Sequence, residues 1–161
     1  MIYKQKRVGK NGRQFMLYKF RTMVKNADQL LAKLKEQNEA GNKQIFKMRD
    51  DPRITKVGRI LRKLSLDESP QLINVLKGEM SMVGPRPPLP DEVHAYEQHH
   101  LYRLKGLPGI TGLWQVSGRS DLSFDDMVKL DRYYLDNWSL RLDLQIILKT
   151  FYVVLARKGA Y

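Results

Sequence analysis

Residues 62–88 constrain the fold of this chain more than any other stretch of its sequence. Ser69 is a favourable N-cap and Pro70 a favourable first helical residue, while Gly78 is typical of a helix end. The sequence Pro85-Arg86-Pro87 that follows restricts the backbone to a stiff turn. These residues predict a short helix that is followed by a rigid loop.

Two adjacent carboxylates, Asp67 and Glu68, lie at the N-terminal side of this predicted helix. Free N–H groups at a helix start favour anions, so most such pairs are solvated helix starts. Here Arg62 lies upstream and Arg86 sits in the proline turn, and the planar fork of arginine suits phosphate oxygens. The combination favours chemistry on a phosphate, in which a carboxylate attacks or binds a divalent metal such as Mg²⁺.

The N-terminal residues predict a β-hairpin. Two basic segments with high β propensity, residues 3–8 and 13–23, flank the sequence Gly9-Lys10-Asn11-Gly12, in which Asn-Gly is a strong turn signal. Apolar residues at helical spacing then predict helices. The predicted helices cover residues 27–41, 55–64, 91–104, 124–137 and 140–156, with Asn26 and Ser123 as N-caps of the first and fourth.

We therefore expect a single α+β domain over residues 1–161, mostly helical, with the N-terminal hairpin packed against several amphipathic helices. In the helix over 55–64 the apolar stripe comprises Val57, Ile60, Leu61 and Leu64. Residues 106–112 predict a glycine-rich loop that lacks the features of a phosphate-binding loop. We expect Trp114 and Trp138 to be core anchors, and we expect His94, His99 and His100 to lie on the surface.

The chain is strongly basic, with 29 Lys and Arg against 17 Asp and Glu and a formal net charge of +12. Such a balance indicates an anionic partner, which could be nucleic acid, an anionic membrane or a phosphorylated ligand. There is no cysteine, which excludes a disulfide framework and a thiolate zinc site. No stretch has the run of about 18 apolar residues that a membrane-spanning helix requires.

Five motifs in a fixed order make the chain resemble the bacterial sugar transferases, the monotopic polyprenyl-phosphate phosphoglycosyl transferases. The motifs are Tyr18-Lys19-Phe20-Arg21-Thr22-Met23, residues 51–59, residues 64–72, Gly84-Pro85-Arg86-Pro87 and residues 108–116. The closing residues 130–161 are similar to hexose-1-phosphate transferases, which start capsule, exopolysaccharide or O-antigen synthesis.

The resemblance implies a two-step reaction. Asp67 matches the nucleophile that attacks the sugar-linked phosphorus of a UDP-sugar and releases UMP, and polyprenyl phosphate then takes the sugar phosphate from the enzyme. Glu68 matches the partner carboxylate that holds Mg²⁺. Positions that match phosphate or nucleotide contacts are Lys19, Arg62, Arg86 and Arg119.

The resemblance also implies work at the cytoplasmic face of the bacterial inner membrane. Members of this family carry an N-terminal segment that dips into the bilayer, and no such segment precedes Tyr3, so we expect a catalytic module without its anchor. Two alternatives remain open: a basic nucleic-acid-binding module and a non-catalytic scaffold on the membrane surface. The first explains the charge but not the Asp67-Glu68 pair. The residues do not distinguish one sugar from another, and they leave a homo-oligomer open.

Overall fold

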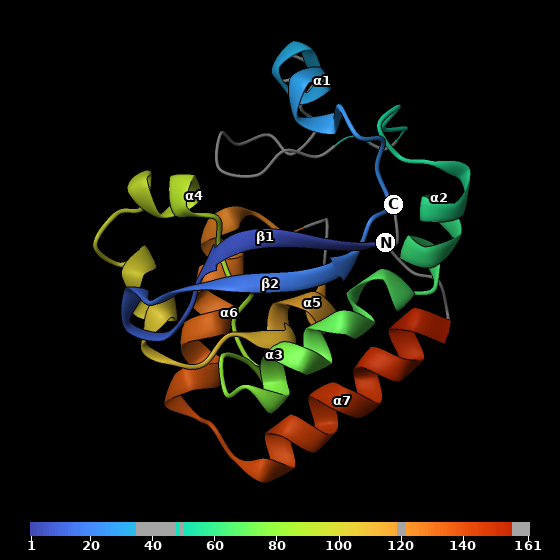
Figure 1. The fold of residues 1–161 in the computed structure, drawn as a ribbon. Coiled ribbons are helices and arrows are strands. Elements are labelled where there is room, and N and C mark those ends of the chain that lie inside the picture. Colours follow the sequence, from blue (N-terminus) through green and yellow to red (C-terminus); the bar gives the residue numbers. More distant parts are fainter. Residues whose placement is uncertain (35–47, 49, 119–121, 156–161) are drawn as a thin grey trace.

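The computed structural model describes residues 1–34, 48, 50–118 and 122–155 (Figure 1). The chain begins with an antiparallel hairpin of strands β1 (Ile2–Val8) and β2 (Gln14–Phe20). In the turn between them, η1 (Lys10–Gly12), Asn11 and Gly12 have φ angles of 55° and 79°. Asn and Gly tolerate this left-handed backbone best, so the predicted hairpin is confirmed, with a second strand that ends before Met23.

Helices make up most of the remaining structure, which confirms the mostly helical α+β class. In chain order they are α1 (Ala27–Leu34), α2 (Lys56–Lys63), the 3-10 helix η3 (Leu66–Gln71), α3 (Leu72–Leu76), α4 (Pro90–His94), the 3-10 helix η4 (His100–Lys105), α5 (Leu113–Ser117), α6 (Phe124–Asp136) and α7 (Leu140–Leu155). Thr55 and Ser123 are the N-caps of α2 and α6, since their side-chain oxygens accept the N–H groups of Gly58 and Asp126. The predicted end of the first helix at Gly41 lies outside the described residues.

A second, parallel sheet joins β3 (Ser81–Val83) to β4 (Gly109–Thr111). The predicted glycine-rich loop therefore contains a strand, which its sequence did not indicate. A Cβ atom on Gly109 would lie only 2.1 Å from the backbone nitrogen of Gly84. Glycine is required there because the two backbones approach so closely, and this contact brings the Pro85-Arg86-Pro87 turn beside β4.

The core centres on Val83 of β3, Tyr134 of α6 and Ile146 of α7, which are at most 4 % exposed. Partly buried side chains that pack around them are Leu113, Val116, Leu135, Leu142 and Ile147. In Figure 1 the hairpin lies above α3, and α7 crosses the lower right of the view. Helix α7 contacts α5, β3 and β4. Among the described helices none is long and apolar enough to cross a membrane.

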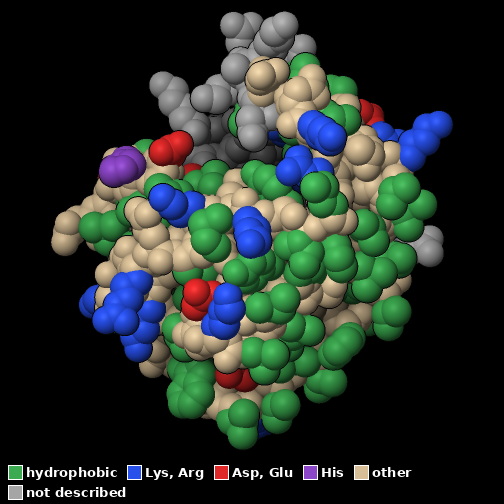
Figure 2. Space-filling model, in the orientation of Figure 1, with side chains coloured by type: hydrophobic (Ala, Val, Ile, Leu, Met, Phe, Trp, Pro, Cys, Tyr) green, Lys and Arg blue, Asp and Glu red, His purple; other side chains and the backbone are tan. Residues whose placement is uncertain are grey.

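Three helices expose an unusual amount of apolar side chain. The members of this apolar surface are Val57 and Ile60 of α2 with its C-cap Leu64, Leu72, Ile73 and Leu76 of α3, and Leu144, Leu148, Phe151 and Leu155 of α7. Figure 2 shows hydrophobic side chains gathered over the side where Figure 1 places these helices. The apolar stripe predicted for α2 is real, but it faces away from the core with Val57 67 % exposed. A spacing pattern shows that a stripe exists and not what covers it.

Other sequence predictions are wrong in detail. The single helix predicted over 91–104 is two short pieces, α4 and η4, and Leu101 points outward. Trp138 is 63 % exposed because it lies in the link between α6 and α7, where its indole N–H donates to Asp143. His94 and His99 are exposed as predicted, but His100 is buried. Trp114 is buried, as expected of a core anchor.

Candidate active site

Asp67 and Glu68 lie in the first turn of η3. The prediction that Ser69 caps this helix is wrong: its hydroxyl donates to the carbonyl of Leu66, and the helix begins after Ser65, whose φ of 53° is left-handed. The pair therefore sits inside the helical turn and not before it. Asp67 is buried, while about a third of the Glu68 side chain is exposed.

Lys19 is the first cation at the pair. It projects from β2, and its Nζ lies 2.6 Å from Oε1 of Glu68. The two residues are distant in sequence and meet because β2 packs against η3. The structure thus brings the predicted phosphate-binding lysine directly onto the predicted metal-binding carboxylate.

Arg62 approaches from α2 and its charge acts on Asp67. Its Nε donates to the hydroxyl of Thr22 at 3.0 Å. This contact depends on a close approach of α2 to the segment after β2: a Cβ atom on Gly58 would lie 2.0 Å from the carbonyl oxygen of Thr22. Glycine at this position therefore allows α2 to carry Arg62 to the site.

The two carboxyl groups have pKa values shifted in opposite directions. Burial, followed by the charge of Glu68, raises the pKa of Asp67, although Lys19 and Arg62 act against this. Burial would also raise the pKa of Glu68, but Lys19, Arg86 and Arg7 outweigh it and hold that pKa below its ordinary value. Asp67 is therefore more basic than an ordinary aspartate, as suits a nucleophile, and Glu68 is more readily ionised than an ordinary glutamate, as suits a metal ligand.

Arg7 is a functional candidate that sequence reasoning missed. It is buried on β1, and burial followed by the nearby charge of Arg86 lowers its pKa to about 10. Its Nη1 donates to the carbonyl of Pro87 at 3.0 Å, and the next residue, Val8, donates its N–H to Pro88 at 3.0 Å. Arg7 thereby fixes the proline turn beside the strand and adds positive charge near Glu68.

The proline turn is held from its other side as well. Gly84 donates its N–H to Thr111, and Gly109 donates its N–H to Pro85, each at 2.9 Å. Between these anchors Arg86 stands near Glu68 and also lines a small pocket. The rest of the pocket wall is formed by Pro88, Glu92, Tyr96, Arg103, Trp114, Phe124 and Met127.

A buried ion pair stands behind this pocket. Arg103 of η4 donates from Nη2 to Oδ2 of Asp131 on α6 at 2.6 Å, and the two side chains are 5 % and 1 % exposed. Nη1 of Arg103 donates to the Tyr96 hydroxyl at 3.1 Å. In the sequence, Arg103 and Asp131 look like ordinary charged residues of helices, so their pairing could not be predicted. The pair joins η4 to α6 and supports the pocket that Arg86 enters.

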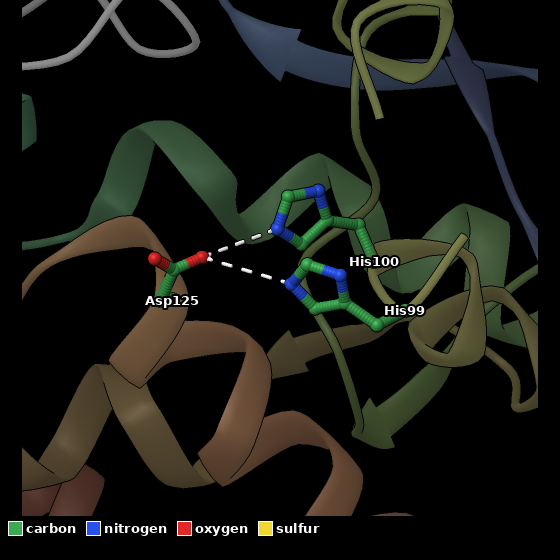
Figure 3. A group of neighbouring side chains, drawn as sticks. All are labelled: His99, His100 and Asp125. Atoms are coloured by element: carbon green, nitrogen blue, oxygen red, sulfur yellow. Dashed lines mark hydrogen bonds and ion pairs between the residues drawn. The ribbon is translucent and has the colours of Figure 1, made fainter. Parts of the chain in front are cut away.

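Figure 3 shows a separate group, His99, His100 and Asp125, whose ligand atoms lie within 4.8 Å of one another. Nδ1 of His100 accepts the backbone N–H of Glu97 at 3.0 Å, so Nε2 carries the ring proton and donates to Asp125 at 3.2 Å. A metal would need the lone pair of Nε2 while Nδ1 uses its own. The group is therefore better suited to bracing η4 against α6 than to holding an ion.

The structure thus assembles Asp67, Glu68, Lys19, Arg62 and Arg86 at one site, and it adds Arg7. Arg119, the remaining predicted substrate contact, lies outside the described residues. Two carboxylates surrounded by cations offer oxygen ligands for a hard divalent ion and positive charge for phosphate oxygens. The arrangement can therefore bind a diphosphate and direct a carboxylate oxygen at phosphorus.

Comparison with known proteins agrees with this chemistry. Residues 1–157 match the family model for bacterial sugar transferases. The exopolysaccharide production protein ExoY of Sinorhizobium fredii is 46 % identical, and the alignment covers 100 % of this chain and 73 % of ExoY. The undecaprenyl-phosphate galactose phosphotransferase of Salmonella typhimurium is 50 % identical over 99 % of this chain and 34 % of its own length.

The galactosyl transferase CpsE of Streptococcus agalactiae is 51 % identical over 99 % of this chain and 35 % of its own length. The chain therefore spans about a third of these longer relatives and about three quarters of ExoY. The match to the family model runs through all the elements that carry the candidate active site. This chain belongs to the bacterial sugar transferase family.

Proposed function

We propose that this chain transfers a sugar 1-phosphate from a UDP-sugar to a polyprenyl phosphate, with Asp67 as the covalent nucleophile. The observation that carries the proposal is the Asp67-Glu68 pair, with its opposite pKa shifts and the cations around it. Relatives named as undecaprenyl-phosphate sugar phosphotransferases support both the donor and acceptor classes. The chain aligns with only about a third of the longer relatives. The proposed reaction therefore refers to the region that this chain shares with them.

In the first step a carboxylate oxygen of Asp67 attacks the phosphorus that bears the sugar. The bond from that phosphorus to the UMP oxygen breaks, UMP leaves, and a sugar-phosphoryl-aspartate remains. In the second step a phosphate oxygen of the polyprenyl acceptor attacks the same phosphorus. The bond to Asp67 breaks, polyprenyl diphospho-sugar leaves, and the carboxylate is restored. Lys19, Arg62 and Arg86 bind the phosphate oxygens and stabilise the charge that develops on them.

Glu68 is the residue that would hold Mg²⁺, with Asp67 beside it. The fit is supported by the donor set, since magnesium prefers carboxylate and phosphate oxygens, and by the lowered pKa of Glu68, which keeps this ligand ionised. The ion would neutralise phosphate charge during transfer. Lys19 is then expected to serve both the carboxylate and the phosphate, because its ammonium group has three donors.

The apolar surface supports a lipid acceptor. It lies on α2 and α3, the helices on either side of η3, and on α7. Exposed cations such as Arg59 and Lys63 share α2 with the apolar residues, as in helices that rest on anionic bilayers. We infer that this surface rests on the cytoplasmic leaflet of the inner membrane, so that polyprenyl phosphate reaches Asp67 from the headgroup layer.

The test is release of UMP from a panel of UDP-sugars, with Mg²⁺ and detergent-solubilised polyprenyl phosphate. We expect at least one UDP-sugar to give UMP and a polyprenyl diphospho-sugar, and we expect Asp67→Asn to give neither. The matched control is Asp126→Asn, which changes an aspartate on α6 whose side chain is 48 % exposed and which is not part of the candidate site. Undiminished turnover by Asp67→Asn would show that another residue is the nucleophile.

A further inference from the structure

The side chain of Asn74 is the most completely buried polar group in the described chain, with 0 % exposure. It lies on α3, which continues directly from η3 and so from Asp67 and Glu68. Its Oδ1 accepts the backbone N–H of Tyr18 at 3.1 Å, and its Nδ2 donates to the carbonyl of Met16 at 2.8 Å. Both contacts are to the backbone of β2.

These contacts make the carboxamide a substitute for a neighbouring strand. Residues Met16 and Tyr18 flank Leu17 and present their carbonyl and N–H groups at the edge of β2 that does not face β1. An unpaired buried edge would be costly. A carboxamide satisfies it because it offers one acceptor and two donor hydrogens on one planar group.

Glu79 completes the arrangement. Its Oε2 accepts the second hydrogen of Asn74 Nδ2 at 2.7 Å, and its backbone N–H donates to the backbone carbonyl of Asn74 at 3.0 Å. Every hydrogen-bonding atom of the carboxamide is therefore used, and its orientation is fixed. Aspartate would lack the donors and leucine would lack both functions, so the chemistry at this position requires an amide.

The residue that follows Tyr18 on β2 is Lys19, whose Nζ contacts Glu68 at 2.6 Å. We propose that Asn74 is a positioning residue that holds β2 against η3 and α3, so that Lys19 is placed on the Asp67-Glu68 pair. Its consequence for catalysis rests on the proposed function. The hydrogen bonds to Met16 and Tyr18 fix the position of β2 relative to η3 and α3. The position of β2 in turn determines whether the Lys19 Nζ can contact Glu68.

The kinetic test is a double-mutant cycle in UMP release with Asn74→Ala and Lys19→Met. A misplacement of about 1 Å can cost on the order of 100-fold in rate. We expect each single variant to lower kcat/KM by about 10- to 100-fold and the double variant to lose little more than the worse single variant. If the fold loss in kcat/KM of the double variant equalled the product of the two single losses, the residues would act independently and the proposal would be overturned.

A control separates positioning from general destabilisation. Ser123→Ala removes the N-cap of α6, away from β2, and is expected to lower Tm while leaving kcat/KM close to that of the unchanged protein. Should Asn74→Ala not fold, Asn74→Ser takes its place, because a hydroxyl is too short to bridge both backbone groups. Kinetic loss in Ser123→Ala equal to that in Asn74→Ala would also count against positioning.

A second measurement does not depend on activity. Amide hydrogen exchange should show Tyr18 protected in the unchanged protein and in Lys19→Met, and unprotected in Asn74→Ala. The ammonium resonance of Lys19 should broaden in Asn74→Ala, as the contact with Glu68 loosens. Retained protection of Tyr18 in Asn74→Ala would refute the strand contact. Absence of UMP from every UDP-sugar would refute the proposed function and leave this exchange result to decide the role of Asn74.

Discussion

The ion pair between Arg103 and Asp131 gives a stability prediction that follows from its burial. Both side chains are almost completely buried, and their closest atoms are 2.6 Å apart. Removal of one partner leaves the other charge buried without a counterion, which typically costs about 3–5 kcal/mol. A buried pair replaced on both sides by apolar groups of similar size is often neutral in stability or even more stable.

We therefore expect Arg103→Met and Asp131→Leu each to lower the free energy of unfolding by about 3–5 kcal/mol. In a chain of this size each kcal/mol corresponds to about 2–4 °C in Tm, so each single variant should lose roughly 6–20 °C. The double variant should recover most of the loss. The assay is thermal and urea unfolding followed by circular dichroism, with Arg132→Met on the exposed face of α6 as the control.

If the free energy of unfolding of either single variant were within about 1 kcal/mol of that of the unchanged protein, the reasoning would be refuted. A buried charge that has lost its counterion should destabilise the fold by more than that. A double variant as unstable as the two losses added together would also refute it, since the two residues would then act independently.

Three further predictions concern charge and the apolar surface. Lys19→Met and Arg62→Met each remove a cation that lowers the pKa of Asp67, so the acid limb of the pH–rate profile should move to higher pH. Leu148→Gln, at a position 68 % exposed on α7, removes apolar area without adding charge, so it should weaken sedimentation with anionic vesicles without lowering Tm; unchanged sedimentation would exclude this surface. Burial raises the pKa of Asp131 from 3.8 to about 6. Between these two pH values the folded chain therefore binds more protons at Asp131 than the unfolded chain does. The contribution of Asp131 to stability should therefore fall as the pH rises through this range. Urea unfolding at several pH values should show that the difference in free energy of unfolding between the unchanged protein and Asp131→Leu changes in the same range.

Much of the fold could be predicted because its signals are local. The Asn11-Gly12 turn needs only left-handed backbone, and the N-caps Thr55 and Ser123 need only an oxygen near the next N–H groups. The same holds for Gly78, which ends α3 with a φ of 73°. Each of these turns and helix ends is determined by interactions within a few residues, so the local sequence is sufficient to predict it.

The rest depends on contacts between distant segments. Strands β3 and β4 are three residues each and exist because their backbones meet, which no periodicity reveals. The exposed stripe of α2 looks in sequence like a core face. Arg7 resembles the other basic residues of its strand, and only the fold shows that it is buried beside Pro87.

The candidate site divides in the same way. Asp67, Glu68 and Arg86 could be recognised from their motifs. The resemblance assigned Lys19 to phosphate contacts, and its ion pair with Glu68 became visible only in the structure. The opposite pKa shifts of the two carboxyl groups could not be predicted from composition. The opposite shifts arise because burial and the charge of Glu68 prevail at Asp67, whereas Lys19, Arg86 and Arg7 outweigh burial at Glu68.

The most direct test of a covalent aspartate is the mass of the intact protein after mixing with UDP-sugar and Mg²⁺ in the absence of the lipid acceptor. We predict a mass gain of one sugar phosphate, located on the peptide that contains Asp67, with an equal amount of UMP released. The gain should disappear when polyprenyl phosphate is added and should be absent in Asp67→Asn. An adduct that persists in Asp67→Asn, or UMP that forms only with the acceptor present and never with an adduct, would contradict the mechanism.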